Sequence, residues 1–152
     1  MVKIRTRLFQ SWFRFSRSMT LGVRGLVTNE AGKVLLVRHT YTPGWYLPGG
    51  GVERGETCET ALRRELAEEG GVALIDMPTL LGVFSNHRNF PNDHVLLYKI
   101  EPKAWEACDT DHAGEIAEIM WCDPRMLPND ITAGTAKRIE EWLGGLKPPQ
   151  HW

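Results

Sequence analysis

Three glutamates near the middle of the chain have the types and spacing that could bind a metal ion. Glu65, Glu68 and Glu69 stand at positions i, i+3 and i+4. The segment that holds them, residues 57–69, is rich in helix-forming residues, so a helix would place the three carboxylates on one face. Carboxylate oxygens are hard ligands that suit Mg²⁺ or Mn²⁺, and such an ion would relieve their repulsion. For the helix alone, the ordinary alternative is a solvated acidic face in which Arg64 pairs with Glu68.

A run of three glycines lies just before this helix. Residues 49–51 let the backbone turn sharply and come close to a ligand, so they could present amides or carbonyls near the metal. Glu56 stands where this loop enters the helix, and there it could brace the loop or reach the ion.

The loop and the helix together resemble the complete Nudix box, the signature of a hydrolase family. Every constrained position matches: Gly50, five residues, Glu56, seven residues, Arg64-Glu65-Leu66, one residue, Glu68-Glu69, one residue, Gly71-Val72. At average residue usage, a chance match in a chain of this length is on the order of one in ten million or rarer.

The resemblance implies a fold, an activity and site residues. Nudix proteins share an α/β/α sandwich with a mixed sheet, and they typically use Mg²⁺ or Mn²⁺ to hydrolyse a nucleoside diphosphate linked to another moiety. By position, Glu65, Glu68 and Glu69 resemble the metal-binding carboxylates, and the carbonyl of Gly49 is an expected further ligand. Arg64 resembles the residue that orients the catalytic glutamates. Glu65, Glu68 and Arg64 are therefore the expected catalytic residues, with the general base either Glu65 or a residue outside the box.

Four residues before the box are candidates for binding a small nucleotide-type substrate. Trp45 and Tyr46 immediately precede the glycines, where either ring could stack on a base or pack in the core. Arg24 and Arg38 fall in expected neighbouring strands and could contact a phosphate, although a solvated arginine is the default.

Two further features lie downstream of the box. Glu115 is a candidate substrate-site carboxylate and Glu118 a weaker one, and the alternative for both is a solvated edge. The polar stretch 85–94 resembles a substrate-facing loop but also fits a hairpin connection. The subtype signatures for ADP-ribose, dinucleoside polyphosphate, coenzyme A and NADH hydrolases are not found, so the substrate stays open.

The remaining segments predict a single α/β domain spanning residues 1–152. Apolar patterning predicts two successive strands that pair with each other, then the acidic helix, three further strands and a C-terminal helix. These segments are residues 20–28, 33–38, 57–69, about 79–85, 94–100, 116–122 and about 132–143. The order predicts a mixed sheet covered by helices on both faces, with an extension at residues 1–19 and a tail at residues 145–152.

The whole chain excludes several classes of protein. A net charge of −1 gives no reason to expect DNA binding, and no apolar run approaches the ~20 residues that span a bilayer. The three cysteines are few and far apart, which favours reduced thiols in a cytoplasmic protein over a disulfide framework.

The N-terminal extension is basic and aromatic. Residues 1–24 hold six lysines and arginines and no acid. Three interpretations stay open: a helix packed on the domain, a homodimer contact that covers the aromatic rings, or attachment to a membrane surface.

The leading prediction is a metal-dependent pyrophosphohydrolase that acts on a nucleoside diphosphate derivative. One alternative is a Nudix-fold module that binds nucleotides without turnover, although such modules commonly lose box glutamates and none is lost here. Another is an RNA-end pyrophosphohydrolase, which would bind RNA in a salt-sensitive manner. An isomerase of the same fold would need catalytic residues that are not found.

Overall fold

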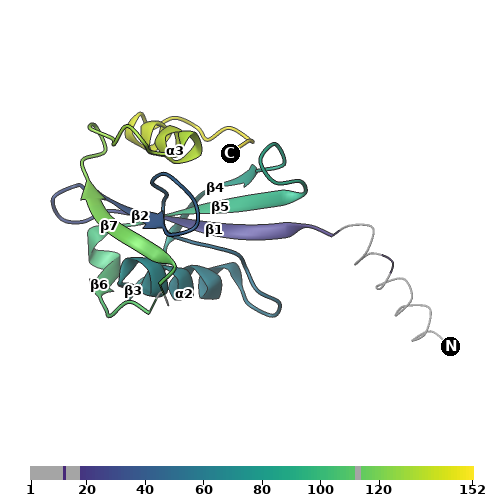
Figure 1. Cartoon of the computed structure of the whole chain (residues 1–152), viewed down its shortest axis with the longest axis horizontal. Helices are drawn as coiled ribbons and strands as arrows, with labels where there is room; N and C mark the ends of the chain where they lie inside the picture. The colour runs from purple at the N-terminus through teal and green to yellow at the C-terminus, as the bar shows by residue number, and fades with distance from the viewer. Residues whose placement is uncertain (1–11, 13–17, 112–113) are drawn as a thin grey trace.

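The computed structural model describes Trp12, residues 18–111 and residues 114–152. The predicted roles of the basic N-terminal extension therefore lie almost wholly outside the described residues. In this part of the chain a layer of strands lies between two helices, one on each face (Figure 1). This arrangement confirms the predicted α/β/α sandwich with a mixed sheet. No helix of the described residues is long and apolar enough to cross a membrane.

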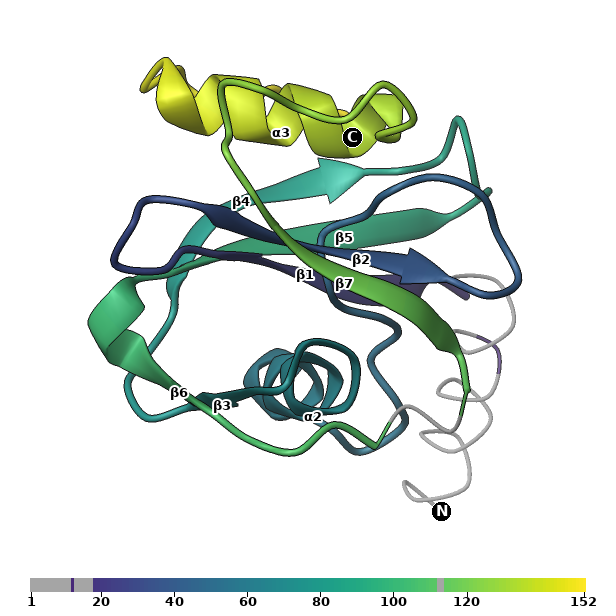
Figure 2. The same ribbon diagram turned by 60° about the vertical axis from the view of Figure 1, so that its left-hand side comes forward.

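Within the described residues, the strands form one three-stranded and two two-stranded sheets. In the first, β1 (Thr20–Val27) pairs in parallel with β5 (Asp93–Ile100), and β5 pairs antiparallel with β4 (Thr79–Ser85). The second pairs β2 (Val34–His39) antiparallel with β7 (Ile116–Cys122), and these two strands lie beside the first sheet in Figure 2. The third joins β3 (Val72–Leu74) to β6 (Trp105–Ala107), which follows the 3₁₀ turn η1 (Pro102–Ala104); none of these three elements was predicted.

The predicted pairing of the first two strands is wrong. β1 and β2 share a single bridge, between Thr28 and Val34, at the turn that joins them. One edge of β1 is taken by β5, and the other edge is hydrogen-bonded to the glycine loop. Both edges of β1 are therefore occupied by segments distant in sequence, and β2 pairs with β7 instead.

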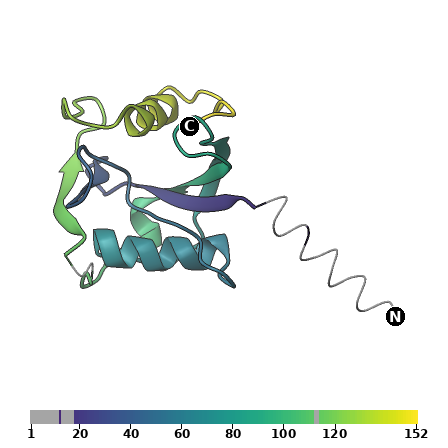
Figure 3. The same ribbon diagram turned by 45° about the vertical axis from the view of Figure 1, so that its right-hand side comes forward.

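Both long helices lie where the sequence predicts them. Helix α2 (Cys58–Gly70) begins after Thr57, whose Oγ1 accepts a hydrogen bond from the Thr60 N–H (3.0 Å), and it ends at Gly71, which is left-handed at φ 63°. Helix α3 (Ala133–Leu143) lies on the opposite face of the strands (Figure 3).

Each helix buries its apolar face against the strands. Leu62 and Leu66 of α2 pack with Val23 and Val27 of β1 in one cluster. Ile139 of α3 belongs to a second cluster, whose members include Leu26, Leu36, Trp45 and Phe84. β1 supplies residues to both clusters, Val23 and Val27 to the first and Leu26 to the second, and it also borders the site described next.

Candidate active site

The glycine loop is fastened to β1 by its backbone. The Val23 N–H donates to the Gly50 carbonyl (2.9 Å), and the Gly25 N–H donates to the Pro48 carbonyl (2.9 Å). Gly49 has φ 141°, and a Cβ there would overlap the Val23 carbonyl. The loop can approach β1 this closely only because it has glycine at this position.

Arg64 gathers the carboxylates of the box. Its Nε and Nη2 donate to both oxygens of Glu56 (2.9 and 3.1 Å), and its Nη1 donates to Glu65 Oε1 (2.6 Å) and lies 3.5 Å from Glu68 Oε2. Nη2 also donates to the carbonyl of Gly51 (3.2 Å). Hydrogen bonding to Arg64 lowers the pKa of Glu56. The guanidinium thus ties the acidic face of α2 to the glycine loop.

Two of the clustered carboxylates are poorly solvated. Glu69 is buried, and its Oε2 accepts a hydrogen bond from the Gly49 N–H (2.8 Å). Burial, helped by the negative charges of Glu65 and Glu115, raises the pKa of Glu69 to about 7, against the opposing effects of the Gly49 N–H and Arg24. Burial also raises the pKa of Glu65, against the opposing effect of Arg64. A cation near these groups would favour their ionised forms.

A buried histidine lies against this cluster. His39, at the end of β2, places Nδ1 3.6 Å from Glu69 Oε1. Burial lowers the pKa of His39, with Arg24 contributing in the same direction. Among the described residues this Nδ1 has no hydrogen-bond partner, so the contact joins a neutral ring to a carboxyl group rather than two full charges.

Arg24 of β1 lies between the glycine loop and the acidic cluster of α2. Its Nη1 donates to the carbonyls of Leu47 (3.0 Å) and Gly49 (2.6 Å), so the predicted carbonyl ligand is held by a guanidinium. The positive charge of Arg24 lowers the pKa values of both Glu65 and Glu69, against burial. Arg24 thereby braces the glycine loop and faces the acidic cluster.

The donor set fits a hard divalent cation. Three carboxylates of one helix face and a backbone carbonyl are oxygen ligands of the kind that Mg²⁺ and Mn²⁺ prefer. Within the described residues, no three or more His, Cys, Asp and Glu side chains are already arranged as a metal site. The reason is visible in the contacts, because Glu65 is turned to Arg64 and Glu69 to the Gly49 amide.

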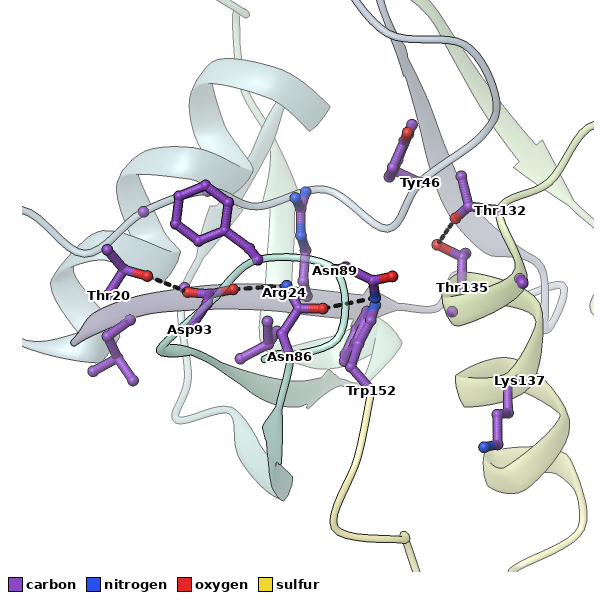
Figure 4. A pocket seen from close by; sticks show the side chains of 18 residues that line it. Thr20, Arg24, Tyr46, Asn86, Asn89, Asp93, Thr132, Thr135, Lys137 and Trp152 are labelled. Atoms are coloured by element: carbon purple, nitrogen blue, oxygen red, sulfur yellow. Dashed lines mark hydrogen bonds between the residues drawn. The ribbon is translucent and has the colours of Figure 1, made fainter.

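A pocket of about 910 Å³ opens beside the glycine loop. One side is formed by Gly50, Gly51 and Arg24, and the opposite side by the first turn of α3, residues 132–135. The lining also includes the start of β1, the β4–β5 connection, Tyr46, Lys137 and Trp152 (Figure 4). Gly50 belongs both to the pocket and to the acidic site, because a Cβ at this position would lie 2.5–2.7 Å from the Glu65 carboxylate.

A chain of hydrogen bonds fixes the polar wall of this pocket. Thr20 Oγ1 donates to Asp93 Oδ1 (2.7 Å), and Asn86 Nδ2 donates to the other Asp93 oxygen (2.7 Å). Asn86 Oδ1 then accepts from Asn89 Nδ2 (2.9 Å), as Figure 4 shows. Because a carboxylate only accepts, the chain sets the orientation of both amides.

The structure does not bring all the predicted substrate residues together. Arg24 and Tyr46 line the pocket. Arg38 instead pairs with Asp130 (2.8 Å) and stacks 4.5 Å over the ring of Trp45, which is buried in the core. These two side chains are therefore placed as structural partners of each other.

The predicted downstream carboxylates differ in position. Glu115 is exposed, its carbonyl accepts the Thr40 N–H (2.8 Å), and its charge reaches His39 and Glu69. Glu118 is 3.5 Å from Arg38 Nε and has a side chain 60% exposed, so it belongs to the Arg38 pair rather than the pocket.

Sequence reasoning missed three parts of the site. His39 carries no motif that would mark it. The first turn of α3 is assembled only by folding, and Trp152 stands in a proline-containing tail that the sequence treats as peripheral. The polar stretch 85–94 gave the one usable signal, since Asn86, Asn89 and Asp93 do line the pocket.

Comparison with known proteins places this site in a family. The NUDIX domain model matches residues 19–143. A candidate 8-oxo-dGTP diphosphatase of Bacillus subtilis (strain 168) is 30% identical over 128 residues, which cover 84% of this chain and 83% of that protein. A MutT-like protein of Streptomyces ambofaciens is 39% identical over 129 residues, covering 85% and 80% of the two chains.

A solved structure agrees with these relatives. The MutT NUDIX hydrolase from Burkholderia pseudomallei matches with a TM-score of 0.68 at 26% identity, over 81% of this chain and 97% of that one. We conclude that the chain belongs to the Nudix family and is a hydrolase acting on pyrophosphate bonds.

Proposed function

We propose that this hydrolase cleaves the phosphoanhydride bond of a nucleoside diphosphate linked to a further moiety, and that it uses Mg²⁺ or Mn²⁺. The observation that carries the proposal is the shared position of Gly50, which lines the large pocket while lying against the Glu65 carboxylate. A nucleotide in the pocket would therefore extend its phosphates over the glycine loop toward the acidic face of α2.

Glu65, Glu68 and Glu69 would hold the metal, together with the Gly49 carbonyl once Arg24 releases it. The bound cation supplies charge neutralisation for the phosphate oxygens as the P–O bond breaks. Arg64 keeps Glu56 and Glu65 in place through its three short hydrogen bonds. It acts as a positioning residue for the carboxylates.

Glu65 is our assignment for the general base. Its carboxylate is the one beside Gly50, where the loop that borders the pocket meets the acidic face of α2. It would take a proton from the water that attacks phosphorus. Arg24, from the other side of the loop, is placed to contact a phosphate of the substrate.

The decisive experiment measures product release from a panel of phosphoanhydrides with Mg²⁺, Mn²⁺ or chelator. The panel contains nucleoside triphosphates, ADP-ribose, nucleotide sugars, dinucleoside polyphosphates and 5′-triphosphorylated RNA. Glu65→Gln and Glu68→Gln are expected to lower kcat about a hundredfold or more. Glu59→Gln is the matched control, because Glu59 lies on the same helix but pairs with Arg63.

Each part of this experiment distinguishes the proposed activity from one alternative. Turnover that survives chelation, or that the two variants leave unchanged, contradicts the proposal. Binding without turnover on any compound favours a nucleotide-binding module, and selective cleavage of the RNA favours an RNA-end pyrophosphohydrolase.

The location and assembly of the protein belong to the same proposal. The three cysteines of the chain are free, which supports a reducing cytoplasm. A homodimer formed through residues 1–19 rests on the sequence alone, and sedimentation of the chain with and without these residues tests it.

A further inference from the structure

The C-terminal segment, residues 147–152, is docked on the domain at the end of β4. The Ser85 N–H donates to the Gln150 carbonyl (2.8 Å), and the Trp152 N–H donates to the Ser85 carbonyl (3.1 Å). Ser85 and His151 thereby form a parallel bridge. The segment predicted as a tail is thus held by main-chain hydrogen bonds beside the pocket.

A buried arginine fixes this segment from the helix side. Arg138 of α3 is 1% exposed, and its Nη1 donates to the His151 carbonyl (2.9 Å). Its Nη2 donates to Glu141 Oε1 (2.7 Å), which satisfies the charge. The guanidinium carbon lies 4.4 Å from the ring centre of Phe84 and 5.5 Å from that of Trp152. These contacts fix the position of His151 and Trp152 relative to α3.

The indole of Trp152 is placed as a wall of the pocket. It meets Phe84 edge to face at 5.5 Å and 82°, and it is only partly buried. A Cβ at Gly134 would overlap the indole Nε1 and lie 2.9 Å from Cδ1, so the first turn of α3 leaves room for this ring. Trp152 lines the pocket together with the amides of Asn86 and Asn89.

We propose that Trp152 is the aromatic surface on which the planar base of a nucleotide substrate stacks, so that residues 147–152 form the base-binding wall of the pocket. The inference rests on the proposed function. Arg138 lies over the ring, and the ring lines the pocket together with the hydrogen-bonding amides of Asn86 and Asn89. Stacking on a flat ring flanked by amides binds nucleobases, whereas the phosphates belong at Gly50 on the opposite side.

Calorimetric binding of dGMP and AMP in Mg²⁺ tests the proposal without turnover, because a monophosphate has no phosphoanhydride bond. Trp152→Leu is expected to weaken binding of at least one of them about tenfold to a hundredfold. Trp152→Phe is expected to bind within about threefold of the native protein. Inorganic triphosphate, which has no base, is expected to bind native protein and Trp152→Leu alike.

Two further variants control for a damaged fold. Trp142→Leu removes a tryptophan that packs beside Lys99, away from the pocket lining, and is expected to leave binding unchanged. Gly134→Ala should displace the indole and weaken monophosphate binding, with no further effect in the Trp152→Leu background, since both act through one ring.

The outcomes separate this proposal from the proposed activity. Equal monophosphate binding by Trp152→Leu and native protein overturns it, as does an equal loss for inorganic triphosphate or no binding of either monophosphate by native protein. If monophosphate binding depends on the Trp152 ring but the protein hydrolyses none of the panel compounds, the result would support the base-binding wall and contradict the proposed activity.

Discussion

One arginine organises the acidic cluster beside the pocket, and another organises the C-terminal segment on the opposite side; the two differ in how deeply their side chains are buried. We call these regions the α2 side and the α3 side. Arg64 on α2 gathers carboxylates, and its side chain is 27% exposed. Arg138 on α3 gathers aromatic rings and a backbone carbonyl, and its side chain is 0% exposed. A partly solvated guanidinium can release a carboxylate to a metal ion, whereas a fully buried one cannot leave without depriving its poorly solvated carboxylate of a partner. The α2 side is therefore built to rearrange, and the α3 side to stay fixed.

The largest effect should come from the α2 side alone. Glu69→Gln removes a carboxylate from the buried cluster, and we expect kcat to fall about a hundredfold to ten-thousandfold. Binding of a nucleoside monophosphate, which depends on the α3 side, should change little. Steady-state kinetics and calorimetry on one preparation check both statements, and a matching loss of monophosphate binding would erase the distinction between the two sides.

The complementary change is Arg138→Leu. It leaves Glu141 without its partner and releases the His151 carbonyl, so the free energy of unfolding should fall by about 3 kcal/mol. Urea denaturation measures this. The double variant Arg138→Leu/Glu141→Leu should regain part of the loss, since no uncompensated carboxylate remains. A loss below about 1 kcal/mol in the single variant would show that the α3 side is not held by this residue.

Arg24 lies between the two sides and should give an intermediate effect. Arg24→Met removes two charge-assisted hydrogen bonds to the glycine loop, and we expect unfolding to become easier by about 2 kcal/mol. The exposed Arg125→Met serves as control. If Arg24→Met and Arg125→Met unfold at the same temperature, the stability of the glycine loop does not depend on Arg24.

A further effect is a pH dependence of stability in chelated protein. Because the pKa of Glu69 is about 7 when folded and 4.5 in its ordinary state, the folded protein binds the extra proton between these values. The free energy of unfolding should therefore fall as pH rises from about 4.5 to about 7, and this slope should be shallower in Glu69→Gln, where the raised pKa of Glu65 still contributes.

His39 acts in the opposite sense over part of this range. Its lowered pKa adds stability as pH rises toward 6.5, but this contribution is present in both proteins and cancels in the comparison. Parallel denaturation curves for native protein and Glu69→Gln between pH 4.5 and 7 would argue against a raised pKa at Glu69.

The sequence predicts the α2 side far better than the α3 side. The box can be recognised in the sequence because its residues have defined chemical roles. Thr57 and Gly71 mark the two ends of α2. The pairing of β1 with β2 was wrong because the competing partners of β1 lie far away in sequence. Local patterns carry no signal of such contacts.

The base-binding wall could not be predicted from the sequence for a related reason. Trp45 is the tryptophan beside the box, yet it is buried under Arg38, while Trp152, from the far end of the chain, reaches the pocket. Which of six tryptophans meets a ligand is decided by tertiary packing, because each has the same ring and the same apolar preference.

The parallel pairing of β1 with β5 also sets an order of events during folding. Thr20 and Asp93, joined at the start of that pairing, are 73 residues apart. Closing so long a loop is slow in comparison with forming the β4–β5 hairpin. In pulse-labelled exchange, the amides of Thr20 and Thr28, which donate to the carbonyls of Asn92 and Ile100, should therefore gain protection after those of β4. Since the glycine loop is hydrogen-bonded to β1, a nascent chain would complete its hydrolytic centre only after β5 has been synthesised and has paired with β1.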